Sequence, residues 1–215
     1  MTIAFFDMDK TLLSKSSGML YVKYLWKRRL ISLREMLATA WISAQYSVNA
    51  LDFPKAMARL SRNIRDGDAI AAKALCDQWV RDDVLRYIAP KALARLREHQ
   101  ASGHAVWLLS ASTQFAVSPV AEHLQIPCRF TELEIVNGHF TGQIVGVDCY
   151  GEGKRVWGER IAAQLGVDLS HCVFYTDSFS DRPFLEVVGR PVAVNPDRAL
   201  RSYAAKRGWP IEYFY

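Results

Sequence analysis

The chain has 215 residues, half of them hydrophobic, and a formal net charge of +5. This length can bury a sizeable core in one large or two small domains, and the composition excludes a disordered chain. The four cysteines form no Cys-x-x-Cys pair, so we interpret them as reduced thiols. We expect a cytoplasmic protein, because no secretory signal is present and the most apolar run, 36–51, contains polar residues.

The first predicted element is a short buried strand over residues 3–6, which is followed by Asp7 and Asp9. If the extended conformation continues, both carboxylates point the same way and share a small volume. Two carboxylates there repel each other and are costly to desolvate. The pair therefore indicates a bound cation, or one carboxylate acting as nucleophile and the other as acid. A plain turn after a strand is the alternative.

The stretch 13–89 is predicted to be helical and is the basic part of the chain, with 13 Lys and Arg against 7 Asp and Glu. Its basic run at residues 15–29 is interleaved with aromatic residues. Three interpretations stay open: a solvated helix face, an electrostatic funnel for an anionic substrate, and a surface for anionic lipid. Nucleic acid is not expected, because no motif supports it. The predicted helices are 18–30, 33–51 and 69–88, and a further helix runs from Pro90 to about residue 103. Residues 52–54 are expected to cap a helix with Pro54 near its first position, and residues 66–68 break the chain.

Beyond the helical stretch, strands and helices alternate, which predicts a parallel, doubly wound sheet. The strands are expected near 104–109, 171–176 and 191–194. Active groups in such sheets lie at the carboxyl ends of strands. A hairpin is predicted over 130–144, because Asn-Gly at 137–138 is a strong two-residue turn.

Three further motifs bring polar residues to strand ends or helix starts. Ser110 follows an apolar strand, and Ser112 or Thr113 is expected to cap a helix that ends near residue 124. Lys154 follows Gly-Glu-Gly at a helix start, where the dipole disfavours a cation, so its place there suggests an anionic partner. The surroundings of Lys154 do not fit a P-loop. The last strand ends in two acids four residues apart, Asp177 and Asp181.

These four motifs, in this order, resemble the haloacid dehalogenase superfamily of phosphohydrolases. Residues 7–11 read Asp-Met-Asp-Lys-Thr and fit its opening Asp-x-Asp-x-Thr, and the likeness is closest to subfamily IB, the phosphoserine-phosphatase-like branch. The resemblance covers nearly the whole chain. It implies an α/β fold with a doubly wound parallel sheet, formed by 1–12 and 90–215, and an inserted all-helical cap, 13–89.

The resemblance also implies the catalytic roles. Asp7 would be the nucleophile that forms an aspartyl-phosphate, and Asp9 the general acid and then base. Ser110 and Lys154 would hold the phosphoryl oxygens. Thr11 belongs to the same phosphate-binding set, although we expect it to brace the loop.

A Mg²⁺ ion is the implied cofactor. Its expected ligands are the Asp7 carboxylate, the Asp9 main-chain carbonyl and the Asp177 carboxylate. Asp181 would orient Lys154 or a metal-bound water. The chain departs from the branch's pattern in the last motif, where Thr176 replaces a common Gly and Ser180 stands where phosphoserine phosphatases usually have Asn.

The expected function is hydrolysis of a small phosphomonoester, with histidinol phosphate as the type of substrate. Phosphoserine is less expected, because phosphoserine phosphatases carry a Glu nine residues after the nucleophile and this chain has Ser16 there. The alternatives are a phosphatidylglycerophosphate-type lipid phosphatase, a phosphotransferase with an acceptor alcohol, and a catalytically idle binding module. Weak contact of the basic cap with anionic lipid and the oligomeric state stay open.

Overall fold

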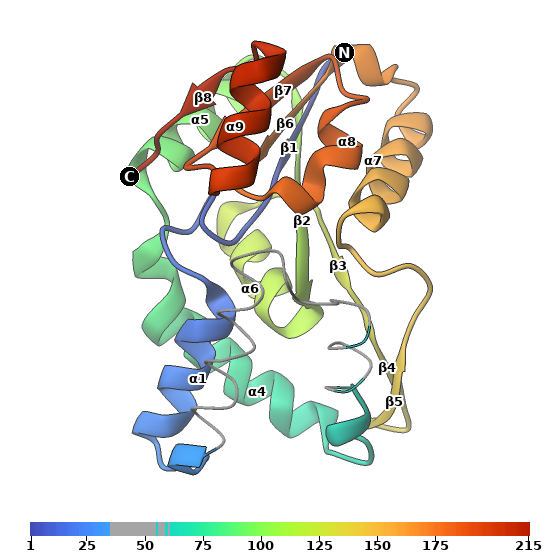
Figure 1. Ribbon diagram of the computed structural model, residues 1–215. Coiled ribbons are helices and arrows are strands. Elements are labelled where there is room, and N and C mark those ends of the chain that lie inside the picture. The colour runs from blue at the N-terminus through green and yellow to red at the C-terminus, as the bar shows by residue number, and fades with distance from the viewer. Residues whose placement is uncertain (35–54, 56–58, 60) are drawn as a thin grey trace.

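The computed structural model describes residues 1–34, 55, 59 and 61–215, and a parallel sheet of six strands forms its centre (Figure 1). The strand order is β3-β2-β1-β6-β7-β8, and every neighbouring pair is parallel. The predicted α/β class with a doubly wound parallel sheet is confirmed. The strands are β1 (Ile3–Phe6), β2 (Ala105–Thr113), β3 (Cys128–Thr131), β6 (Cys172–Thr176), β7 (Arg190–Val194) and β8 (Ile211–Glu212).

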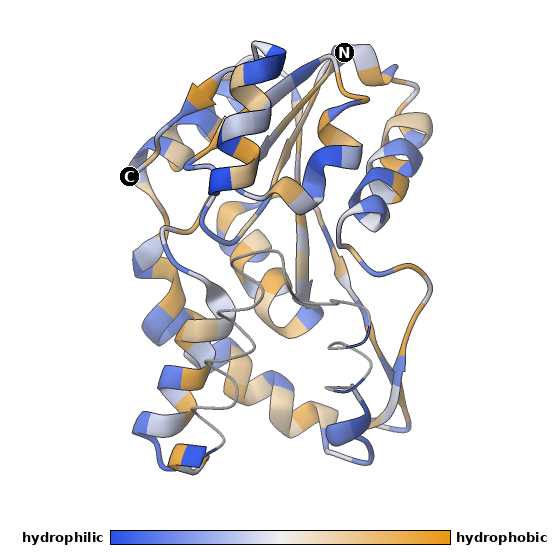
Figure 2. Cartoon of the chain, in the orientation of Figure 1, coloured by the Kyte–Doolittle hydropathy of each residue, from blue (hydrophilic) through white to orange (hydrophobic). Residues whose placement is uncertain are grey.

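Both faces of the sheet are buried, which explains why β1 is apolar at every position. Ala4 and Phe6 belong to one hydrophobic cluster, and Ile3 and Phe5 to the other, on the opposite face. Figure 2 shows the covering helices striped in blue and orange, as amphipathic helices are. The first cluster contains residues of α5 (Pro90–Ala101) and α6 (Gln114–Leu124), and the second contains residues of α7 (Glu152–Gln164), α8 (Arg182–Leu185) and α9 (Arg198–Arg207).

The helical stretch leaves and re-enters the α/β part through adjacent backbone. The Ala89 N–H donates to the Leu12 carbonyl at 2.9 Å, and the Ser14 N–H donates to the Tyr87 carbonyl at 2.8 Å. The described helices of this stretch are α1 (Ser17–Lys27) and α4 (Ala69–Trp79). The predicted helix over 33–51 lies outside the described residues apart from its first two.

Two helix predictions need correction in detail. The first helix ends at Lys27 rather than at residue 30. The second, predicted as continuous over 69–88, ends as an α-helix at Trp79 and continues as a π-helical turn over Val80–Val84 and a 3₁₀ turn over Leu85–Tyr87. The predicted break before α4 is present, and the Asp68 carboxylate caps the helix by accepting from the N–H groups of residues 70 and 71. No helix in the described part of the chain is long and apolar enough to cross a bilayer.

The predicted hairpin is confirmed as an antiparallel pair, β4 (Leu133–Val136) and β5 (His139–Ile144). Asn137 and Gly138 both have positive φ, 52° and 82°, as a two-residue hairpin turn requires. The hairpin binds the helical stretch through Phe140, whose carbonyl accepts from the Asp66 N–H at 2.8 Å.

Candidate active site

The predicted site residues gather at the carboxyl ends of the central strands. Asp7 directly follows β1, and Asp177 directly follows its neighbour β6. Ser110 departs from the prediction, because β2 does not end before it but continues to Thr113. The reason is that Thr113 still pairs with Thr131 of β3, beyond an irregularity in the register. Thr113 takes the N-cap position of α6 but makes no side-chain cap bond.

Lys154 is the centre of a buried ionic network. Its Nζ lies 2.6 Å from Asp7 Oδ1 and 2.7 Å from Asp181 Oδ2, and none of the three residues is more than 6% exposed. Lys154 is the third residue of α7, so the predicted helix-start position holds. The position of Lys154 at a helix start suggested an anionic partner, and the carboxylates of Asp7 and Asp181 are two such partners.

Thr176 and Asp181 form the second layer of this network. The Thr176 hydroxyl donates to Asp181 Oδ2 at 2.6 Å, on the same oxygen that Lys154 contacts. Asp181 Oδ1 is buried and meets no hydrogen-bond donor among the described residues. Thr176 therefore fixes the carboxylate that holds Lys154. Sequence analysis identified Thr176 only as a residue that stands where Gly is common in the phosphoserine-phosphatase-like branch.

Burial raises the pKa values of Asp7, Asp9 and Asp177 at this site. The pKa of Asp7 rises to about 7, because loss of solvation outweighs the attraction of Lys154. The pKa of Asp177 is raised well above its usual value by burial first and then by the negative charge of Asp7. Such a site disfavours two ionised carboxylates unless further positive charge enters it.

Asp9 is held by the first residue of α1, a contact that sequence analysis missed. Asp9 Oδ1 accepts from the Ser17 N–H and Oδ2 from the Ser17 hydroxyl, both at 2.9 Å. The Ser17 hydroxyl also lies 3.1 Å from that of Ser112 in β2. Ser16, at the N-cap position, makes no side-chain cap bond, so the Asp9 carboxylate accepts from the start of α1 instead. Burial raises the pKa of Asp9, against the effect of the Ser17 hydrogen bonds.

A narrow cavity of about 20 Å³ lies between these groups. Its volume is close to what one water molecule needs. Ser110 and Thr11 are buried nearby in the fold but do not line it; the Ser110 hydroxyl accepts from the Ser112 N–H at 3.2 Å, and the Thr11 hydroxyl meets no partner among the described residues. The lining residues are Asp7, Asp9, Lys10, Ser16, Lys154, Asp177, Ser178, Asp181 and Asp197.

Three lining residues, Lys10, Ser178 and Asp197, were not predicted. Lys10 adopts a left-handed conformation with φ 56°, and its carbonyl accepts from Asn195 Nδ2 at 3.2 Å. The Asp197 N–H donates to the Asp177 carbonyl at 2.8 Å, which ties the start of α9 to the strand end that carries Asp177. These contacts join segments far apart in the sequence, so no local pattern could reveal them.

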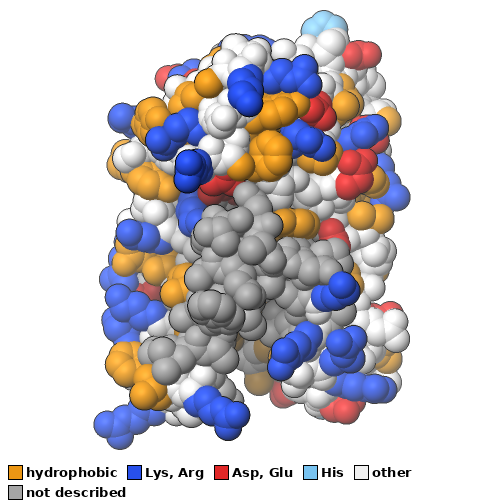
Figure 3. All heavy atoms as spheres, viewed as in Figure 1, with side chains coloured by type: hydrophobic (Ala, Val, Ile, Leu, Met, Phe, Trp, Pro, Cys, Tyr) orange, Lys and Arg blue, Asp and Glu red, His pale blue; other side chains and the backbone are white. Residues whose placement is uncertain are grey.

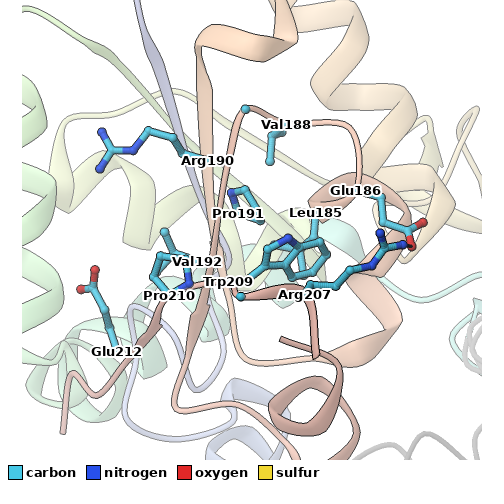
Figure 4. A pocket seen from close by; sticks show the side chains of 12 residues that line it. Leu185, Glu186, Val188, Arg190, Pro191, Val192, Arg207, Trp209, Pro210 and Glu212 are labelled. Carbon is cyan, nitrogen blue, oxygen red and sulfur yellow. Dashed lines mark hydrogen bonds and ion pairs between the residues drawn. The ribbon is translucent and has the colours of Figure 1, made fainter. Parts of the chain in front are cut away.

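A larger pocket of about 660 Å³ lies elsewhere, at the amino end of β7 (Figure 4). Arg190 and Pro191 at the start of β7, together with Trp209 and Pro210 after α9, contribute to its wall. Asp7 and Asp177 follow strand ends, so this pocket is at the opposite end of the sheet. It contains none of the predicted site residues.

Comparisons with known proteins agree with these motifs. The family model for haloacid dehalogenase-like hydrolases matches residues 4–186. In Mycobacterium tuberculosis, the probable phosphatase Rv3661 is 32% identical over 99% of this chain and 75% of its own length, and the phosphoserine phosphatase SerB1 is 32% identical over 98% and 70%. The histidinol-phosphatase of Neisseria meningitidis serogroup C is 29% identical over 99% of this chain and 98% of its own.

Solved structures share this fold over 99–100% of the chain. A Bordetella pertussis protein of unknown function is 28% identical with a TM-score of 0.87, covering 99% of this chain and 98% of its own. A substrate-bound phosphoserine phosphatase is 17% identical with a TM-score of 0.75, covering 100% and 93%. At 17% identity, the likeness to the second structure supports the fold alone.

Proposed function

Since the chain belongs to the haloacid dehalogenase-like hydrolase family, and is a phosphatase of that family, we propose that it hydrolyses a phosphomonoester through an aspartyl-phosphate on Asp7. The observation that carries this proposal is the buried contact of Lys154 with Asp7 and Asp181 at 2.6 and 2.7 Å. A nucleophilic carboxylate beside a fixed cation suits attack on a phosphoryl group, whose transfer depends on positioning and charge stabilisation.

The reaction has two steps. In the first, an Asp7 carboxylate oxygen forms a bond to phosphorus, the bond to the leaving oxygen breaks, and Asp9 gives that oxygen a proton. In the second, water attacks the same phosphorus, Asp9 takes the proton from that water, and Asp7 leaves with inorganic phosphate as the product. The raised pKa of Asp9 supports this role, because the first step needs Asp9 in its protonated form.

Lys154 would hold the phosphoryl oxygens, because its ammonium group lies 2.6 Å from Asp7, the residue to which phosphorus would be bound. Ser110 completes this set, and its buried hydroxyl currently accepts a hydrogen bond from Ser112. Thr11 has a role in bracing the loop after β1, since it is fully buried and does not line the cavity. Asp181 positions Lys154.

Mg²⁺ fits the other side of the site. The Asp7 and Asp177 carboxylates line the same cavity, and with the Asp9 main-chain carbonyl they offer the hard oxygens that this ion prefers. Among the described residues no three His, Cys, Asp or Glu side chains are grouped to hold a metal, but this set needs only two carboxylates. Repulsion between Asp7 and Asp177 supports the proposal, because a cation would relieve it. When bound, Mg²⁺ would neutralise charge on the phosphoryl group.

We assign residues 13–89 to a cap that closes over the site. Support comes from Ser17 of α1, which contacts Asp9, and from the adjacent entry and exit of the stretch at Leu12 and Ala89. Asp7, Lys154 and Asp181 are each at most 6% exposed, so we expect the cap to move for substrate to reach them.

The substrate is a small phosphorylated metabolite, and Ser16 argues against phosphoserine. Ser16 lines the cavity at the position where phosphoserine phosphatases carry Glu, and a neutral hydroxyl cannot pair with an ammonium group as a carboxylate does. Histidinol phosphate is the type of substrate that fits best, in line with the relative named histidinol-phosphatase.

The test is phosphate release from p-nitrophenyl phosphate with Mg²⁺, for the wild type and for Asp7→Asn. The amide is a poor nucleophile, so turnover should be lost in Asp7→Asn. The matched control is Asp168→Asn, an exposed carboxylate outside the site, which should keep full activity. An acid-quenched reaction should carry a hydroxylamine-labile phosphoryl group on the peptide that contains Asp7. Full activity in Asp7→Asn, or a phosphoryl group on another peptide, would refute the mechanism.

A further inference from the structure

One side of α1 exposes apolar side chains that belong to no hydrophobic cluster of the described residues. Met19 is 41% exposed and Trp26 is 46% exposed. Beyond the helix, Leu30 and Leu33 are 56% and 58% exposed. Met19 and Trp26 are seven residues apart, so they lie on one face of the helix.

The opposite side of α1 already packs against the protein. Leu20 and Tyr24 belong to a hydrophobic cluster, and the Tyr21 ring lies 4.9 Å from the Trp79 ring of α4. One apolar side is enough to fix a surface helix to its core. A second apolar side, turned to solvent, is typical of a surface that binds something else.

Lysine side chains lie beside these apolar side chains, whereas Arg28, just after α1, is paired with Asp82 at 3.5 Å. Lys23 and Lys27 lie on the same helix face, because they follow Met19 by four and eight residues. Figure 3 shows orange and blue side chains close together at the lower left, where Figure 1 places α1. No Asp or Glu occurs from residue 10 to residue 34, and the basic residues between Thr11 and Arg34 are Lys15, Lys23, Lys27, Arg28, Arg29 and Arg34.

We propose that this surface, the α1 face, binds an anionic lipid bilayer, and define it by the exposed α1 residues Met19, Lys23, Trp26 and Lys27 together with Leu30, Leu33 and Arg34, which follow the helix in the chain. Exposed Trp and Leu beside Lys and Arg are the pattern of helices that lie in the membrane interface. Each basic side chain near an anionic surface contributes about 1 kcal/mol.

Other uses of the α1 face fit less well. An electrostatic funnel for substrate needs the charges but no exposed Trp or Leu. A second copy of the chain would bring two strongly basic surfaces together, and like charges facing each other are costly. An anionic bilayer accounts for both the charge and the apolar side chains.

The α1 face also has a fixed relation to the active site. α1 begins at Ser17, which contacts Asp9, and its 11 residues span about 16 Å. The enzyme would therefore work close to the membrane surface. This inference does not depend on the reaction proposed above, because binding to lipid needs no turnover.

The test is co-sedimentation of the full chain with vesicles of phosphatidylglycerol and phosphatidylcholine, against vesicles of phosphatidylcholine alone. We expect binding to the anionic vesicles only, weakened by salt. Lys23→Glu/Lys27→Glu/Arg34→Glu should weaken partitioning about a hundredfold or more, given about 1 kcal/mol for each of the three charges. Trp26→Ser/Leu30→Ser should weaken it by a similar factor at constant charge.

Matched controls change the same chemistry elsewhere. Arg198→Glu/Arg201→Glu/Lys206→Glu reverses three exposed charges on α9, and Ile70→Ser removes an exposed apolar side chain from α4. Both should keep wild-type binding, and all variants should keep activity toward the soluble aryl phosphate. No binding to anionic vesicles, or equal losses in the controls, would overturn the proposal. A dimer in sedimentation equilibrium that Trp26→Ser/Leu30→Ser dissociates would assign the face to a second copy and also overturn it.

Discussion

Replacing Thr176 with Val tests whether one hydroxyl holds Lys154 in the place that the proposed reaction requires. Val has nearly the same shape as Thr but cannot donate to Asp181 Oδ2, which Thr176 contacts at 2.6 Å. Thr176 and Asp181 are no more than 1% exposed, so bulk water does not replace the lost donor. Asp181 would keep only Lys154 as a partner, since its Oδ1 has no donor among the described residues.

The magnitude follows from the kind of bond that is lost. A hydrogen bond to a charged group contributes about 1.5–3 kcal/mol. If this contribution supports the placement of Lys154 in the transition state, kcat should fall about 10- to 100-fold, because each 1.4 kcal/mol is a factor of ten. The free energy of unfolding should fall by about 1.5–3 kcal/mol for the same reason.

The assay is steady-state hydrolysis of p-nitrophenyl phosphate, with urea unfolding measured on the same preparations. Thr176→Ser is the matched control, because it keeps the hydroxyl and loses only a methyl group. It should cost about 1 kcal/mol in stability and less than roughly threefold in kcat. Equal kcat values for Thr176→Val and Thr176→Ser would refute the idea that the hydroxyl positions Lys154 through Asp181.

Three further changes are predicted. Gly158→Ala should lower the free energy of unfolding by about 1–3 kcal/mol, since its new Cβ would lie 2.1 Å from the Phe184 ring; an unchanged urea midpoint would contradict this packing. Burial lowers the pKa of His99 to about 4, so below pH 6.5 the unfolded chain binds a proton that the folded chain does not. This group alone should therefore cost about 1–2 kcal/mol of stability between pH 7 and pH 5, and the wild type should lose that much relative to His99→Gln, since the raised pKa values of the site carboxyls act on both proteins alike; urea titrations at the two pH values measure the difference. Ser17→Ala removes one of the two donors to Asp9 and should lower kcat about 3- to 10-fold, with recovery in Ser17→Thr; no change would mean that this contact does not position Asp9.

The central strands could be predicted because their burial leaves a pattern in the sequence. β1 and β6 are buried at every position, and each is followed by an Asp at the sheet's carboxyl edge. β8 could not be predicted, since it has two residues and depends on pairing with β7. The end of β2 was misplaced because Ser110, Ser112 and Thr113 look like helix caps, whereas the pairing that keeps them extended comes from β3.

At the site, too, local motifs could be predicted from the sequence and contacts between distant segments could not. The motifs with Asp7, Lys154 and Asp181 were predicted from their order along the chain, and the structure brings these three together over as many as 174 residues of sequence. The bond from Ser17 to Asp9 could not be predicted, because it depends on a chain reversal after Asp9, where Lys10 has φ 56°. Sequence patterns pointed to the candidate site residues, but the neighbours that hold those residues became visible only in three dimensions.

The order of strands in the sheet has a consequence for synthesis of the chain. β1 is flanked by β2 and β6, so Ile3 is paired with Ala105 and with Cys172. At about 5–20 residues per second, a ribosome adds Cys172 roughly 10–30 s after Ile3. During that time the most buried strand of the finished protein has one neighbour at most. The nascent chain must therefore keep four consecutive apolar residues from misassociating until β6, at Cys172–Thr176 of 215 residues, has been made.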